Sequence, residues 1–208
     1  MGFSGDLVFA RSDRPLLQAP VFDSLDDGLK ATVVTWEARP GGWQTLQFDF
    51  GTWDDNALPG LVEWSGAPAC VAQIHDSDVA LVTGLDVTGR RWQAWLNPDV
   101  AARLRAEEPE DLEDQLLWLD TPEFHEAVGQ QRAEIEAEIP ADAERAVAWA
   151  ATAGPHVTPP TPVRVEGLLR SHESCVEDLF STLLDRLGFP PAADLSPAPS
   201  EAKDRQSG

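Results

Sequence analysis

Two different hydrophobic periods divide the chain, and this division constrains the fold more than any other feature of the sequence. The apolar segments of the first hundred residues are short and strand-like, and in one of them Leu46, Phe48 and Phe50 alternate with Gln47 and Asp49. That period is typical of a strand with one buried and one solvated face. After residue 97 the apolar residues follow helical spacing, as Ile135 and Ile139 do. The sequence therefore predicts an α+β fold, with a mostly antiparallel sheet from the N-terminal half packed against helices from the C-terminal half.

The connections between the apolar runs of the first half are short. Runs at 69–75, 78–84 and 90–96 are joined by Asp76-Ser77 and by a turn that ends at Gly89. Connections of this length join antiparallel neighbours. A fourth and a fifth run flank a Pro-Gly-Gly turn at 40–42 and predict another hairpin.

Proline positions mark the expected helices of the second half. Asn97 and Thr121 each stand before a proline, which is typical of an N-cap residue followed by Pro at the first helical position. We expect Pro140 to end the second of these helices, and a further Ala-rich helix to follow at about 142–153.

The domain organisation follows from these elements. We expect a single α+β domain over 1–153 and a stiff, extended Pro-rich linker over 154–162. An amphipathic helix over 163–189 is expected to dock on the domain, because an exposed leucine stripe promotes aggregation. The tail over 190–208 is rich in Pro, Ala and Ser and is predicted to be disordered.

Charge and cysteine content narrow the function classes. The chain has 208 residues and a formal net charge of −21, which repels phosphates and anionic lipids. We therefore expect no direct nucleic-acid or membrane partner. Two cysteines, and no apolar N-terminal run of the signal-peptide type, indicate reduced thiols in a cytoplasm.

An acidic block is the strongest anomaly of the chain. From 107 to 144 there are fourteen Asp or Glu residues and one basic residue, Arg132. Crowded like charges lower stability but speed association with a cationic partner. We expect the block to bind a basic protein, although a merely solvated helix face would have the same composition. The predicted contact residues are Glu107, Glu108, Glu110, Asp111, Glu113 and Asp114.

The stretch His75-Asp76-Ser77-Asp78 admits two interpretations. Asp and Ser favour a tight turn between the flanking strands. Alternatively, His75, Asp76 and Asp78 are the predicted ligands of a metal site, with Asp54 and Asp55 as further candidate ligands. A calcium loop of the EF-hand type is excluded, because the required oxygen ligand and glycine are replaced by Ala80 and Leu81. The turn is the favoured interpretation, and we expect no cofactor.

Three segments, at 5–17, 41–49 and 66–85, are similar to segments of uncharacterised acidic actinobacterial proteins. The resemblance covers most of residues 1–190. Because those proteins have no established activity, it implies a bacterial cytosolic origin and no particular function.

These observations favour a non-catalytic acidic intracellular binding protein of the immunity or inhibitor type, with a basic protein partner. One alternative is a metal-dependent hydrolase that uses the turn at His75–Asp78. Another is a protein that imitates the charge of DNA. The sequence leaves the oligomeric state open.

Overall fold

The predicted α+β class is confirmed by the computed structural model, which describes residues 2–106, 118–119, 121–154, 157 and 160–192. Its six strands form one antiparallel sheet in the order β2-β3-β1-β4-β5-β6. The strands are β1 (Gly5–Arg11), β2 (Val34–Thr35), β3 (Trp43–Asp49), β4 (Ala69–His75), β5 (Val79–Leu85) and β6 (Arg91–Leu96).

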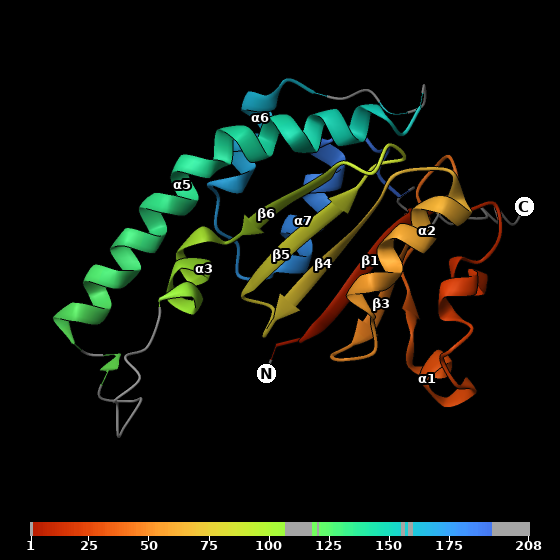
Figure 1. The fold of residues 1–208 in the computed structure, drawn as a ribbon, viewed down its shortest axis with the longest axis horizontal. Coiled ribbons are helices and arrows are strands. Elements are labelled where there is room, and N and C mark those ends of the chain that lie inside the picture. The colour runs from red at the N-terminus through yellow and green to blue at the C-terminus, as the bar shows by residue number, and fades with distance from the viewer. Residues whose placement is uncertain (1, 107–117, 120, 155–156, 158–159, 193–208) are drawn as a thin grey trace, which may run out of the picture.

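Helices occupy both halves of the chain, but the long ones come from the second half (Figure 1). The α-helices are α1 (Asp27–Thr32), α2 (Leu58–Ser65), α3 (Pro98–Arg105), α5 (Pro122–Ala151), α6 (Pro162–Leu169) and α7 (Val176–Arg186). Short 3-10 turns are η1 (Leu16–Gln18), η2 (Pro20–Phe22) and η3 (Asp55–Ala57).

The three predicted hairpins are confirmed, although their strand ends differ from the predicted ones. β4 has the predicted bounds, whereas β5 and β6 each begin one residue later than expected. β2 pairs with β3 across the Pro-Gly-Gly turn, but over two residues only. β1 lies between β3 and β4, so the first strand of the chain becomes a central strand of the sheet.

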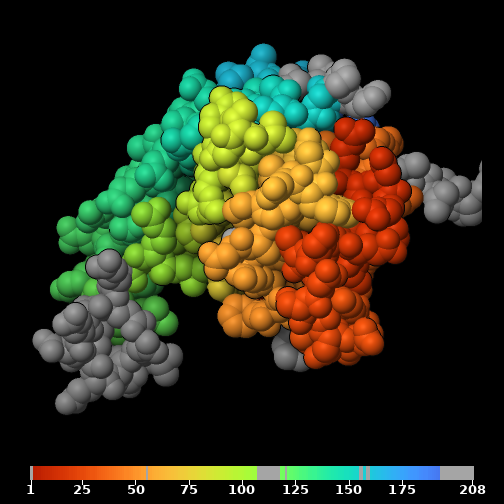
Figure 2. Space-filling view, turned by 45° about the vertical axis from the view of Figure 1, so that its right-hand side comes forward, coloured from red at the N-terminus to blue at the C-terminus, as the bar shows by residue number. Residues whose placement is uncertain are grey.

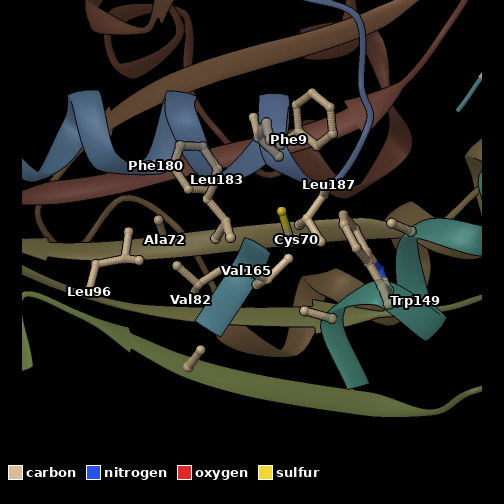
Figure 3. Packing of buried hydrophobic residues seen from close by; sticks show 14 of the residues in the cluster. Phe9, Cys70, Ala72, Val82, Leu96, Trp149, Val165, Phe180, Leu183 and Leu187 are labelled. Carbon is tan, nitrogen blue, oxygen red and sulfur yellow. The ribbon is translucent and has the colours of Figure 1, made fainter. Parts of the chain in front are cut away.

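One face of the sheet carries the larger apolar core. Side chains of β1, β4, β5 and β6 on this face are buried together with those of α5, α6 and α7. Figure 3 shows Phe180 and Leu183 of α7 pointing toward the strands that carry Phe9, Cys70 and Ala72. Each large apolar side chain buried in this way stabilises the fold by about 1.5–3 kcal/mol.

The opposite face is covered over only part of its width. A second cluster places Val8, Leu46 and Val71 against α2 and the 3-10 turns of the N-terminal half. On the same face, Gln93 of β6 is exposed and Leu81 of β5 is half-buried. The β5–β6 side of this face is therefore more open than the β1–β3 side (Figure 1).

The expectation that Pro140 ends a helix is wrong. α5 runs without interruption from Pro122 to Ala151, and the helix expected at about 142–153 is its second half. Proline removes one helical hydrogen bond and costs about 3 kcal/mol inside a helix. Ile139 and Ala143 on either side of Pro140 are buried in the main core, and this packing offsets the cost. Pro140 itself faces solvent.

The predicted single helix over 163–189 is also wrong, because this segment forms the two helices α6 and α7. Residues 170–175 between them are not helical. Val165 of α6 and Leu183 of α7 are fully buried in the core shared with the sheet, so both helices pack on the domain. Val157, within the predicted linker, is buried in the same core. Most of the predicted disordered tail, 193–208, lies outside the described residues.

Both cysteines are free thiols. Burial raises the pKa of the Cys70 thiol, which packs in the main core as an apolar side chain. Over the described part of the chain, no helix has both the length and the apolar character needed to cross a membrane.

Candidate partner-binding surface

The long helix α5 carries the described part of the acidic block. Its N-terminus is built as the sequence predicts: the Thr121 hydroxyl oxygen accepts a hydrogen bond from the Phe124 N–H at 3.1 Å, and Pro122 occupies the first turn. Glu123 in the same turn lies near the positive end of the helix dipole.

One side of α5 is apolar and packs on three successive partners. Phe124 forms an edge-on ring contact with Trp118, with centroids 5.8 Å apart. Ile135 is buried in a small cluster with Ala101 of α3, and Ile139 begins the contact with the main core. Figure 1 shows that the N-terminal half of α5 extends beyond the sheet, where it packs against α3.

The other side of α5 is acidic and exposed. Its exposed carboxylates are those of Glu123, Glu126, Glu134, Glu136, Glu138 and Glu144, which together form what we call the acidic face of α5. The green atoms of this helix run along one side of the molecule in Figure 2.

Intramolecular cations neutralise only part of the acidic face. Arg132 binds Glu136 at 2.8 Å and also pairs with Asp99 of α3. Glu134 has a long ion pair of 3.9 Å with an arginine of α3. Within the described residues, Glu123 and Glu126 have no ion pair. A cationic partner would therefore meet uncompensated charge at the projecting end of the helix.

The contact residues predicted from the sequence, 107–114, lie outside the described residues. The structure describes the later part of the same acidic block, over 123–144.

The stretch at His75–Asp78 forms a tight turn. Asp76 and Ser77 have φ angles of 51° and 59°, and the Asp78 N–H donates to the His75 carbonyl at 3.0 Å. Two consecutive residues with positive φ are typical of the turn that best matches the twist of a hairpin.

The polar side chains of this turn bind other parts of the protein. The Asp76 carboxylate accepts a hydrogen bond from the Gly2 N–H at 2.8 Å. The Ser77 hydroxyl accepts one from the Phe3 N–H at 2.8 Å and donates one to Glu177 at 2.7 Å. The turn therefore ties the N-terminal segment to the start of α7.

The metal-site interpretation receives no geometric support. Among the residues that the structure describes, no three His, Cys, Asp or Glu side chains are grouped so that they could hold a metal ion. The Asp54 carboxylate, a further ligand considered for this site, instead caps η3 by accepting the Asn56 N–H at 2.9 Å.

A cleft between β6 and α5 is a feature that sequence reasoning missed. Its volume is about 640 Å³, and three arginines line it: Arg91, Arg105 and Arg145. Arg145 pairs with Asp142 at 2.5 Å. Burial raises the pKa of Asp142 despite this contact. The three arginines come from three different elements, so no local pattern in the sequence predicts that they lie together. The one signal available was that basic residues are scarce in so acidic a chain.

Comparison of the chain with protein-family models, with curated proteins and with solved structures found no match in any of the three.

Proposed function

We propose that the protein is a non-catalytic binding module of the immunity or inhibitor type, which recognises a basic surface of another protein through the acidic face of α5. The observation that carries this proposal is the pair Glu123 and Glu126, exposed at the projecting end of the helix with no ion pair among the described residues. Uncompensated charge costs stability and speeds encounter with a cationic partner about 10- to 1,000-fold.

The spacing of the charges supports a protein partner over imitation of DNA. The first and last of the six carboxylates of the acidic face are 21 positions apart, or about 32 Å at 1.5 Å per residue. That is about one charge per 5 Å, whereas duplex DNA has about one per 1.7 Å. The two free thiols are consistent with a cytoplasmic location, which belongs to the same proposal.

Affinity capture with charge-reversed variants tests the proposal. The immobilised full chain is compared with the double variant E123K/E126K and with a matched control, E37K/E63K. Glu37 and Glu63 are also exposed and have no ion pair within the described residues. Each double variant replaces two negative charges by two positive ones, so both change the net charge from −21 to −17.

The expected result is one basic protein, retained in stoichiometric amount by the unmodified chain and by the control but lost from E123K/E126K. Retention should also fail when ionic strength rises from about 0.01 M to about 1 M, because the Debye length falls from about 30 Å to about 3 Å. If no protein is retained, or if both double variants retain it equally, α5 does not bind a basic partner and the proposal is wrong.

A further inference from the structure

The cleft between β6 and α5 follows the outer edge of the sheet. All five consecutive residues 91–95 of β6 line it. The side chains of Trp92 and Ala94 are buried on the face that packs on α7, whereas Arg91 and Gln93 are exposed on the other face. Because successive side chains of a strand alternate between faces, a cleft that touches all five residues must run along the backbone edge.

The register shows which backbone groups point into this cleft. The Asp86 N–H donates to the Arg90 carbonyl at 3.0 Å, and the pairing continues without a break to the end of β6. Hydrogen-bonded and non-hydrogen-bonded pairs alternate in an antiparallel ladder. The N–H and C=O groups of Arg91, Gln93 and Trp95 therefore point away from β5. Among the described residues, none of these groups has a hydrogen-bond partner outside the sheet.

The walls of the cleft combine positive charge with apolar surface. Arg145 is bound to Asp142, and Arg105 has one long ion pair of 3.9 Å. Arg91 has no ion pair within the described residues. The half-buried ring of Trp95 supplies apolar surface on the open face of the sheet. Two carboxylates, Glu138 and Asp142, also line the cleft, so its lining has three positive and two negative charges and a net charge of +1, in a chain whose net charge is −21.

From these observations we infer that β6 binds an extended segment of a partner protein by strand addition, and that the segment carries an acidic side chain opposite Arg91. Strand addition uses the unpaired backbone groups of an edge for affinity and the neighbouring side chains for specificity. The cleft volume of about 640 Å³ lies within the range of about 300–1,000 Å³ that binding sites usually have.

A second copy of the chain is a poor occupant, because two molecules that each carry a net charge of −21 repel one another. The other edge strand of the sheet, β2, is only two residues long, so it has few free backbone groups with which an added strand could pair. Glu138 belongs both to the cleft and to the acidic face of α5, but neither Glu123 nor Glu126 lines the cleft, so the inference does not rest on the proposed function.

Substitution at Gln93 tests strand addition directly. Gln93→Pro removes the N–H that points into the cleft and leaves the hydrogen bonds between β5 and β6 intact, and an edge strand tolerates such a proline. Gln93→Ala is the matched control, because both variants lose the same side-chain hydrogen bond to Thr83, which is 3.0 Å long. The probe is a random heptapeptide library displayed on phage, selected on the full chain.

We expect enriched peptides in which β-branched residues flank an Asp or Glu. A synthetic peptide of that sequence should bind Gln93→Pro at least about tenfold more weakly than Gln93→Ala, and Arg91→Glu should weaken it to a similar degree. In hydrogen exchange, the amides of Arg91, Gln93 and Trp95 should exchange rapidly in the unbound protein and slow down when the peptide is added.

Three results would overturn the inference: no enrichment over an unrelated immobilised protein, equal binding to the proline and alanine variants, or unchanged exchange of the three amides. The E123K/E126K variant should bind the peptide as the unmodified chain does. Failure of strand addition is thereby distinguished from failure of the proposed function.

Discussion

Asn97 is a single buried side chain that joins three parts of the chain, and its replacement should be among the most damaging in the protein. It is 1% exposed and has a φ of 57°, in the left-handed region. Its amide nitrogen donates to the carbonyls of Asp78 and Glu173, the latter at 2.9 Å. Its amide oxygen accepts the Glu173 N–H at 3.1 Å. The start of β5 is thus bound to the segment before α7.

The cost of Asn97→Ala follows from these contacts. Three backbone groups lose their partner, at a net cost of about 1 kcal/mol each. The left-handed backbone adds about 1 kcal/mol for alanine, which adopts it less readily than asparagine does. We expect the free energy of unfolding to fall by about 4 kcal/mol. Asn97→Gly should cost about 1 kcal/mol less, because glycine adopts a positive φ without strain.

Urea unfolding followed by tryptophan fluorescence measures these differences. Asn56→Ala is the control. Asn56 is exposed and, among the described residues, its side chain bonds Asp54 alone, so the change should stay within about 0.5 kcal/mol. A loss below about 1 kcal/mol for Asn97→Ala would refute the reasoning, because it would mean that the three backbone groups find other partners at no cost.

Two further predictions concern the backbone of α5 and a buried carboxylate. Pro140→Ala should raise the free energy of unfolding by about 1–3 kcal/mol, because it restores a helical N–H at an exposed position. Pro122→Ala is the control, because a proline in the first turn removes no helical hydrogen bond, and it should change the free energy of unfolding by less than about 0.5 kcal/mol. Urea titration of both variants checks this, and equal effects would contradict it. Asp86 is buried, and although burial acts to raise its pKa, hydrogen bonds from Thr88 and Arg90 outweigh burial and lower it. Its stabilising contribution is therefore complete above the ordinary aspartate pKa and is lost as pH falls through the lowered value. Asp86→Asn should lower the free energy of unfolding by about 2 kcal/mol near pH 7 and by progressively less in acid. Urea unfolding measured over that pH range checks this, and a loss that does not depend on pH would contradict the lowered pKa of Asp86.

Local sequence signals predicted the elements well wherever one segment controls its own conformation. An apolar run that ends at the Asp76-Ser77 turn was enough to place β4, and the sequence Thr121-Pro122 was enough to place the start of α5. Both rest on interactions within a few residues, which the order of amino acids alone specifies.

Candidate binding surfaces were less predictable, because they depend on which segments the fold brings together. The acidic composition of 107–144 was evident, but only the structure shows that Glu123 and Glu126 lie on an exposed helix that projects past the sheet. Arg91, Arg105 and Arg145 are far apart in the sequence and meet only because α5 lies beside β6.

The sequence by itself thus determined the α+β class, the antiparallel pairing of neighbouring strands and the acidic character of the surface. Tertiary structure alone decided the central position of β1, the continuity of α5 through Pro140 and the role of Asn97 as a bridge instead of a side-chain cap. The physical reason is the same in each case. The burial of side chains and backbone groups from distant segments contributes several kcal/mol, which exceeds the local preference of any one residue.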